Sequence, residues 1–272
     1  MSKLLHIPDV IKQQLAGKNH FQSIMQLHGK PFRDVAGRKT IQVQLGGKSY
    51  FVKQHFGVGW GEIFKNLLSL KKPILGAMTE VAAIQHLASL GIPTTPLVAY
   101  GQQGWNPASL QSFVMTVDLG DIVSLEDLSA DWKTTPPDET FKQTLIIAVA
   151  QLAAKLHQAG LCHRDFYLCH FVMKQAELKQ GVIQLYLIDL HRMLQNQTST
   201  GQAVMKDIAG LYFSAMDCGL NEVDMTLFKT HYLPQNEVFW QQVCARAHQL
   251  HAKFNSTKFQ KRLAAEKSAI RE

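Results

Sequence analysis

No run of apolar residues in this chain reaches the roughly 18 that a helix needs to cross a bilayer. The first residues, MSKLLHIPDVIKQQ, hold one early lysine but no sustained apolar stretch, so we expect no secretory signal. Cysteine is scarce, with four residues in a chain of 272. Without an export signal, so few cysteines are typical of reduced thiols rather than disulfides. We therefore expect a cytoplasmic protein.

Acidic residues are too few to balance the basic ones: 21 Asp and Glu stand against 28 Lys and Arg, a net charge of +7. Most of the excess lies in the last part of the chain. A solvated helical face accounts for it as well as a patch for anionic lipid or an acidic protein partner does. Nucleic-acid binding is the least supported reading, because no recognised motif accompanies these charges. The basic residues of this tail are Arg246, Lys253, Lys258, Lys261, Arg262, Lys267 and Arg271.

Short alternating segments from Pro31 onward predict antiparallel strands at 31–35, 40–45 and 49–55. Gly46-Gly47 suits the tight turn of a hairpin. A helix that starts at an N-cap Thr79 and ends at Gly91 follows, and then two more strands, within 92–103 and 112–120. Although Gly47-Lys48-Ser49 resembles the end of a phosphate-binding P-loop, that motif needs a glycine where this chain has Gln42.

Lys53 lies on the same face of its predicted strand as Phe51. A lysine on an inward face is costly unless it meets a counter-ion, and Glu80, in the first turn of the next helix, is a candidate. Simpler explanations stay open for both residues. Lys53 could point to water at an edge, and Glu80 could serve the helix dipole alone.

The segment 57–77 predicts a helix with apolar residues at helical spacing and lysines among or just after them. Such a helix either packs on its own lobe or lies amphipathically on a membrane surface. The apolar positions are Ile63, Phe64, Leu67, Leu68 and Leu70, and the lysines are Lys65, Lys71 and Lys72.

The rest of the chain is dominated by helical patterns, at 138–158, 207–216, 221–233 and 237–267. We expect an α+β, bilobal fold with a small antiparallel β lobe, which carries one inserted helix, and a larger helical lobe. The expected divisions are an N-terminal extension (1–30), an N-lobe (31–117) and a C-lobe (118–272), with a hinge at 117–122.

Two aspartates of the predicted C-lobe lie where a helix or a strand ends. Asp165 lies on the loop after the long helix, in LCHRDFYLCHF, and Asp189 ends the strand LYLID. Phosphoryl transfer from ATP needs a lysine for the phosphates, a carboxylate for Mg²⁺ and a carboxylate that accepts the proton of the attacking hydroxyl. Lys53, Asp189 and Asp165 meet these requirements in this order.

These residues resemble those of the protein-kinase-like superfamily. A closer resemblance is to the bacterial lipopolysaccharide core heptose(I) kinases, and it runs from about Pro31 to beyond Leu220. It is carried by SYFVK, GEIFKNLLSLKKPILGA, the ADW and PP of 130–137, HRDFYLCHF, IDLHR and DIAGLYFSAM.

The resemblance implies ATP-dependent phosphorylation of the 4-hydroxyl of inner-core heptose I, on a lipid-linked lipopolysaccharide acceptor at the inner face of the inner membrane. It implies Asp165 as catalytic base, Lys53 with Glu80 at the nucleotide phosphates, and Asp189 on magnesium. His163 and Asp207 would support the catalytic loop. Partners implied or left open are an anionic membrane surface and an acidic protein, with no nucleic acid.

Some positions depart from protein kinases. The turn that should be glycine-rich has a single glycine, Gly37, so Arg38 is a candidate phosphate ligand. His170 stands where an asparagine ligand of the metal is expected, and Asp-Leu-His at 189–191 replaces Asp-Phe-Gly. The heptose kinases share both features. Two alternatives stay open, a small-molecule kinase of aminoglycoside-phosphotransferase type and a binding-only pseudokinase. The pairs Cys162-His163 and Cys169-His170 fit no standard zinc spacing.

Overall fold

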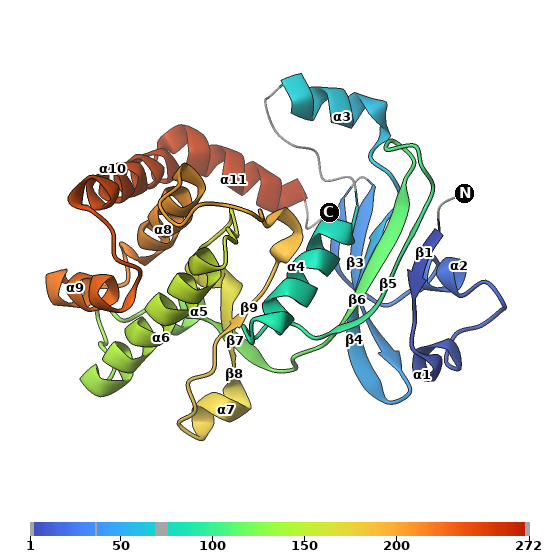
Figure 1. Ribbon diagram of the computed structural model, residues 1–272, viewed down its shortest axis with the longest axis horizontal. Helices are drawn as coiled ribbons and strands as arrows, with labels where there is room; N and C mark the ends of the chain where they lie inside the picture. The colour runs from blue at the N-terminus through green and yellow to red at the C-terminus, as the bar shows by residue number, and fades with distance from the viewer. Residues whose placement is uncertain (1–2, 36, 69–75, 270–272) are drawn as a thin grey trace. The chain divides into compact units, whose positions relative to one another are not determined.

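A computed structural model of the protein describes residues 3–35, 37–68 and 76–269 (Figure 1). The chain forms two compact units. Unit 1 consists of Met1–Ile122, Lys174–Ala176 and Tyr186–Met193, and unit 2 consists of Val123–Met173, Glu177–Leu185 and Leu194–Glu272. No helix among the described residues is both long enough and apolar enough to span a bilayer.

Unit 1 is built on a six-stranded sheet in which every neighbouring pair is antiparallel. The strand order is β1-β5-β6-β4-β3-β2. Both Gly46 and Gly47 have positive φ, as the predicted hairpin turn between β3 and β4 requires. The strands are β1 (Lys3–His6), β2 (Lys30–Val35), β3 (Arg38–Leu45), β4 (Lys48–His55), β5 (Leu97–Gln103) and β6 (Gln111–Val117).

The two faces of this sheet have different roles. Side chains at even positions of β4, such as Val52, enter an apolar core with Phe21 and Ile24 of α2 (His20–Met25) and Phe113 of β6. Helix α1 (Asp9–Lys12) adds Ile11 to the same core. The first 30 residues, expected as an extension, thus supply β1, α1 and α2 to the sheet and its core. The odd positions of β4, which include Lys53, face the opposite side.

Between β4 and β5, the part of the chain that the structure describes forms the helices α3 (Gly59–Leu68) and α4 (Met78–Ser89). The prediction that Thr79 caps α4 is wrong, because Ala77 is the N-cap residue and makes no side-chain cap. The N–H of Ala77 instead donates to the Ser112 hydroxyl of β6 at 3.0 Å. A partner from the sheet therefore takes the place of a local capping side chain.

Unit 2 is mostly helical. The predicted long helix is α6, whose N-cap Asp138 accepts from the N–H of Phe141, and Leu145, Val149 and Leu156 are buried along it. The α-helices are α5 (Leu125–Leu128), α6 (Glu139–Gln158), α8 (Gln202–Ala215), α9 (Glu222–His231), α10 (Glu237–Phe254) and α11 (Thr257–Ala269). Short elements complete the two units: α7 (Gln175–Lys179), β7 (Ile122–Ser124), β8 (Phe171–Lys174), β9 (Tyr186–Leu187), and the 3₁₀ turns η1 (Leu168–His170) and η2 (Leu190–Arg192).

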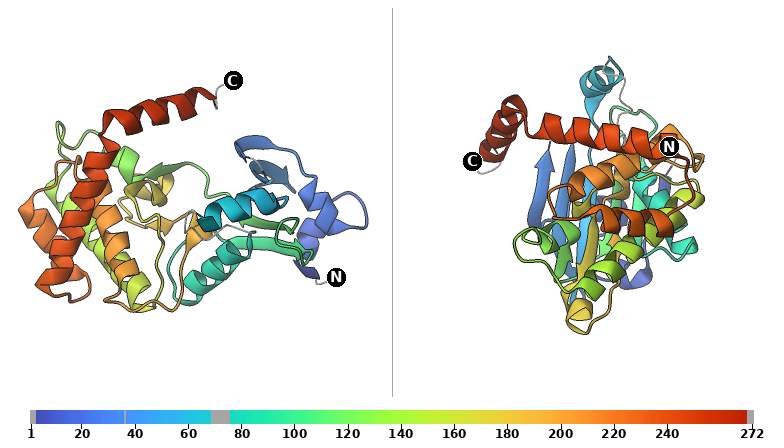
Figure 2. Two further views of the ribbon diagram at one scale, coloured as in Figure 1. Left: turned by 90° about the horizontal axis from the view of Figure 1, so that it is seen from above. Right: turned by 90° about the vertical axis from the view of Figure 1, so that its left-hand side faces the viewer.

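The single helix predicted for 237–267 is two helices, α10 and α11, which meet at an angle (Figure 2). Asn255 caps the end of α10, and the Ser256 hydroxyl accepts from the N–H of Phe259 in α11 at 3.4 Å. The Ser256 hydroxyl also donates to the Lys253 carbonyl at 2.6 Å, so it bonds to backbone groups on both sides of the break and favours it.

Candidate active site

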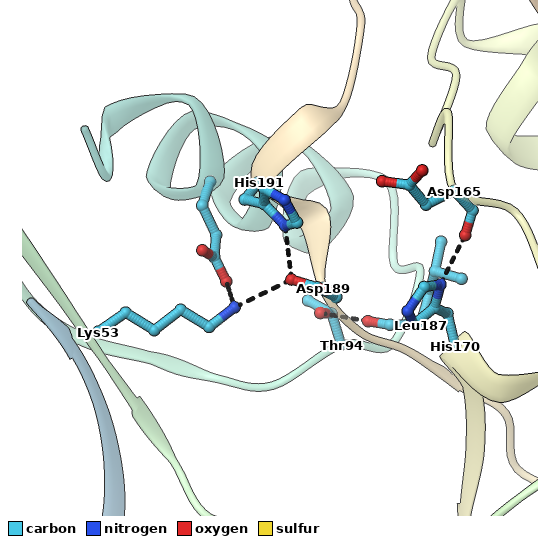
Figure 3. A network of polar contacts seen from close by, with 8 residues as sticks. Lys53, Thr94, Asp165, His170, Leu187, Asp189 and His191 are labelled. Atoms are coloured by element: carbon cyan, nitrogen blue, oxygen red, sulfur yellow. Dashed lines mark hydrogen bonds and ion pairs between the residues drawn. The ribbon is translucent and has the colours of Figure 1, made fainter. Parts of the chain in front are cut away.

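Lys53 of β4 lies between two carboxylates of unit 1 (Figure 3). Its Nζ is 2.7 Å from Oε1 of Glu80 and 3.2 Å from Oδ1 of Asp189. Burial lowers the pKa of Lys53, but the charges of Glu80 and Asp189 and the hydrogen bonds to them outweigh burial and raise this pKa. The predicted Lys53–Glu80 ion pair is confirmed, and Lys53 is held as a cation.

Glu80 is nearly fully buried, with an exposed fraction of 4%. Its second oxygen, Oε2, is buried and has no hydrogen-bond partner among the described residues. A buried carboxylate whose one ion pair is with Lys53 holds that lysine in place, because losing the pair leaves an uncompensated charge.

Asp189 follows the short strand β9, which is attached to the loop after α4. The Thr94 hydroxyl donates to the carbonyl oxygen of Leu187 at 2.6 Å, and the Leu187 N–H donates to the carbonyl of Pro93 at 3.0 Å. Asp189 itself has a left-handed backbone, with φ of 62°. Its Oδ1 accepts from Nδ1 of His191 at 2.6 Å (Figure 3). Sequence reasoning missed the role of Thr94, because a threonine that precedes a strand carries no signal of a bond to a distant residue.

Gly37 lies in the turn between β2 and β3, and Arg38 is the first residue of β3. Gly37 has φ of 77°, and a Cβ there would lie 2.5 Å from the carbonyl oxygen of Gly57, so only glycine fits this position. Burial, followed by repulsion from Arg33, lowers the pKa of Arg38, while Asp189 and Glu80 raise it. Arg38 therefore lies in the electrostatic field of the same carboxylates as Lys53.

His55 of β4 is a further buried group of this site that the sequence did not single out. It pairs with Arg38 across the β3–β4 ladder. Burial, then the positive charges of Arg38 and Lys53, lowers the pKa of His55 from 6.5 to about 3. Its Nε2 is buried and has no hydrogen-bond partner among the described residues. A neutral imidazole thus lies next to the cations of this site.

In unit 2, Asp207 of α8 holds the loop that contains Asp165. One carboxylate oxygen accepts the N–H of His163 at 2.6 Å, and the other accepts the N–H of Arg164 at 2.8 Å. Arg164 has a positive φ of 72°. A backbone turn of this kind persists only where its surroundings fix it, and the carboxylate of Asp207 does so here.

His170 is linked to the same loop (Figure 3). Its Nδ1 lies 2.6 Å from the carbonyl oxygen of Asp165, so Nδ1 carries the proton and donates. The ring of His163 stacks on that of His170, with centroids 5.4 Å apart. In a neutral imidazole this tautomer puts the lone pair on Nε2, which is how metal-binding histidines are commonly oriented.

One group of buried side chains among the described residues approaches metal-site spacing: His157, Cys162 and Asp207. Burial, then the charge of Asp207, raises the pKa of Cys162 to about 12, so the thiol stays protonated. His157 instead bonds to the Tyr232 hydroxyl at 2.8 Å and to Asp207 at 3.4 Å. One histidine, one cysteine and one aspartate match none of the standard structural zinc sets. The group links α6 to the Asp165 loop.

The unit 1 residues fit a magnesium nucleotide. A lysine kept charged suits phosphate oxygens, and the carboxylate of Asp189, at the end of a strand, offers the oxygen ligand that Mg²⁺ prefers. The predicted site residues therefore fall into two groups. Lys53, Glu80, Asp189, Gly37 and Arg38 belong to unit 1, while His163, Asp165, His170 and Asp207 belong to unit 2.

Known proteins resemble this chain over most of its length. Residues 22–232 match the family described as "Lipopolysaccharide kinase (Kdo/WaaP) family". WaaP of Pseudomonas aeruginosa, a lipopolysaccharide core heptose(I) kinase, is 40% identical over 229 residues, which are 84% of this chain and 85% of that protein. Its counterpart from Escherichia coli is 43% identical over 222 residues, or 79% of this chain and 82% of that protein.

A solved structure described as "WaaP in complex with acyl carrier protein" is 33% identical and has a TM-score of 0.76. The match covers 94% of this chain and 100% of that one. This likeness confirms the predicted α+β, kinase-like fold, with a sheet-based part and a larger helical part. The chain belongs to the lipopolysaccharide kinase (Kdo/WaaP) family.

Proposed function

We propose that this protein is an ATP-dependent sugar kinase that phosphorylates heptose I of the lipopolysaccharide inner core, at the 4-hydroxyl. The observation that carries the proposal is Lys53, held as a cation between the carboxylates of Glu80 and Asp189. The relatives at 40% and 43% identity, both named heptose(I) kinases, support heptose as the acceptor. In this proposal residues 31–117 form the N-lobe, which residues 1–30 complete, and residues 118–272 form the C-lobe. The segments Lys174–Ala176 and Tyr186–Met193, the second of which carries Asp189, follow the N-lobe in sequence but belong to unit 1.

Each site residue has one role in this proposal. Lys53 and Arg38 bind phosphate oxygens, Gly37 lets the β2–β3 turn approach them, and Glu80 keeps Lys53 in place. Asp165 accepts the proton of the sugar hydroxyl and orients it for attack.

Magnesium and the loop around Asp165 complete the proposal. Asp189 holds magnesium, and Nε2 of His170 is a second ligand. His163 and Asp207 keep the Asp165 loop in shape. Bound Mg-ATP supplies the transferable phosphoryl group and the charge that neutralises the transition state.

We also propose an acyl carrier protein as a partner, since a solved relative is described in complex with one. Two features of unit 2 support the pairing. The tail is basic, which suits an acidic protein, and an apolar cavity of about 90 Å³ lies among α6, α8 and α10. We propose that this cavity can receive an acyl chain. Its lining includes Trp132, Leu145, Val149, Leu211, Phe228 and Trp240.

The protein also works at an anionic membrane in this proposal, on the cytoplasmic face, because the acceptor is lipid-linked. The basic residues of the tail supply attraction of about 1 kcal/mol each near such a surface. Of the lysines predicted to contribute, Lys65 belongs to α3, whereas Lys71 and Lys72 lie outside the described residues.

The test is complementation of a strain that lacks core-heptose phosphorylation, read by mass spectrometry of its lipopolysaccharide, together with an assay of the purified enzyme. We expect one added phosphate on heptose I with the wild type. Asp165→Ala should lower kcat at least about 100-fold, as loss of a catalytic base does. Wild-type activity in Asp165→Ala would contradict its role as the base. An inactive wild type would favour the pseudokinase, and phosphorylation of aminoglycosides alone would favour the small-molecule kinase.

A further inference from the structure

Among the exposed large apolar side chains of unit 1, four lie on α3 and on the loop before β6, and they have no part in the proposed catalysis. Trp60, Phe64 and Leu68 of α3 have exposed fractions of 51%, 57% and 87%, and Trp105 of the loop before β6 has 82%. Single exposed apolar residues are common, but a group of them that includes two tryptophans is typical of a binding surface. We call these four residues the α3 surface.

The geometry joins these side chains into one region. Trp60, Phe64 and Leu68 recur every four residues and therefore lie on one side of α3. The rings of Trp60 and Phe64 are stacked, with centroids 5.8 Å apart. Figure 1 shows α3 projecting beyond the ends of β5 and β6 rather than covering a face of the sheet.

The loop that carries Trp105 is attached to the start of α3. The N–H of Gly59 donates to the carbonyl of Ala108 at 2.9 Å. Gly57 has φ of 91°, and a Cβ there would lie 2.6 Å from the same carbonyl oxygen, so the two segments approach more closely than any other residue permits. The loop that carries Trp105 is thereby bonded to the start of α3, at the residue before Trp60.

The helix also has an inward side, because Ile63 is buried with an exposed fraction of 6%. Between Gly59 and Leu75 the sequence has one acidic residue, Glu62, and three lysines. An aromatic and aliphatic side on a lysine-containing helix is typical of helices that lie in the membrane interface. Tryptophan is favoured at that depth, because its ring is apolar and its N–H reaches water.

We propose that the α3 surface inserts into an anionic bilayer and attaches the enzyme to the membrane that holds its acceptor. The inference rests on the proposed function for its choice of membrane. A bilayer can receive this projecting apolar row without a matching groove, and the excess of lysine over acid in the sequence 59–75 suits anionic headgroups. Insertion adds an apolar contribution, which salt does not screen, to the attraction of the basic tail.

The tryptophans make a direct test possible. Trp132 and Trp240 are buried, whereas Trp60 and Trp105 are exposed, so a fluorescence change on adding vesicles reports the α3 surface. With the full chain and vesicles of phosphatidylethanolamine and phosphatidylglycerol, we expect a blue shift and quenching by lipids brominated in their acyl chains. Trp60→Phe and Trp105→Phe should each remove part of the quenching and keep binding. Vesicle binding without quenching would overturn insertion.

A second variant tests the contribution to affinity. Trp60→Gln/Phe64→Gln should lower partitioning into these vesicles by about tenfold or more at high salt. The matched control, Val223→Gln/Val238→Gln, removes exposed apolar side chains from unit 2 and should partition like the wild type. Equal partitioning of both variants would overturn the proposal.

Activity assays separate this inference from the proposed function. Trp60→Gln/Phe64→Gln should phosphorylate a deacylated, water-soluble core oligosaccharide at the wild-type rate, and a vesicle-embedded acceptor more slowly. A wild type inactive on both acceptors would refute the proposed function, while the quenching result would still decide insertion. Loss of acyl carrier protein binding with unchanged vesicle partitioning would assign the α3 surface to a protein partner and overturn insertion.

Discussion

Lys53 and His55 lie on the same face of β4, yet their surroundings favour opposite charge states. Two carboxylates raise the pKa of Lys53, whereas burial and neighbouring cations lower that of His55 to about 3. A protonated His55 would add a third positive charge beside Lys53 and Arg38. Because the imidazole is neutral, it adds no repulsion to the two cations on that face of the sheet.

His55 makes the stability of the protein depend on pH. Its folded pKa lies below the unfolded value of 6.5, so below pH 6.5 the unfolded chain takes up a proton that the folded chain excludes. Stability is therefore retained above pH 6.5 and lost as the pH falls towards 3. From pH 7 to pH 5 the loss should be about 2 kcal/mol, at ~1.4 kcal/mol per pH unit.

Urea unfolding at the two pH values measures this loss. His55→Leu should lose about 2 kcal/mol less than the wild type between pH 7 and pH 5. His248→Gln, which changes an exposed histidine, should keep the wild-type dependence. The assignment to His55 fails if His55→Leu and the wild type lose the same stability.

At the scale of elements, the attachment of β9 positions Asp189. Thr94→Val removes the hydroxyl that bonds to the Leu187 carbonyl and leaves this oxygen with one donor fewer. We expect a loss of about 1–2 kcal/mol in stability. We also expect a higher magnesium concentration at half-maximal rate, because Asp189 is less well held.

Thr144→Val is the control for that change, because its hydroxyl bonds to the Thr140 carbonyl on the exposed side of α6. It should change neither the magnesium requirement nor stability by a comparable amount. A Thr94→Val enzyme with the wild-type magnesium dependence would show that β9 needs no such attachment.

The elements also show how far sequence reasoning reaches. Alternation in β3 and glycines at a hairpin are local signals, and they predicted β3 and β4. The Lys53–Glu80 pair was expected from an inward-facing lysine and from the family resemblance. The start of α4 was mispredicted because its support is Ser112, a residue 35 positions away from Ala77. The same holds for Thr94 and for the Tyr232–His157 bond, whose partners are 93 and 75 positions apart. Contacts between distant residues leave no periodicity in the sequence.

At the scale of the whole molecule, the location of the net charge of +7 decides which part of the chain attracts anionic lipid. If the tail attracts the enzyme to anionic lipid, Lys253→Glu/Lys258→Glu/Lys261→Glu should weaken vesicle binding at low salt by about 100-fold or more. All three lysines are exposed. The effect should shrink as salt is added, because screening acts on exposed charges.

The control for this prediction has the same total charge. Lys48→Glu/Lys133→Glu/Lys179→Glu reverses three exposed lysines outside the tail. It should bind vesicles more tightly than the tail variant does. Equal losses in both variants would mean that net charge alone attracts the protein to the membrane, and that the tail has no special role.

The left-handed backbone of Asp189 has a consequence for the design of variants. At φ of 62°, aspartate and asparagine are tolerated because their short polar side chains bond locally, whereas alanine or a β-branched residue is strained. Asp189→Asn therefore removes the charge and keeps the turn, while Asp189→Ala changes both at once. A comparison of the two separates the electrostatic contribution of this carboxylate from its conformational one.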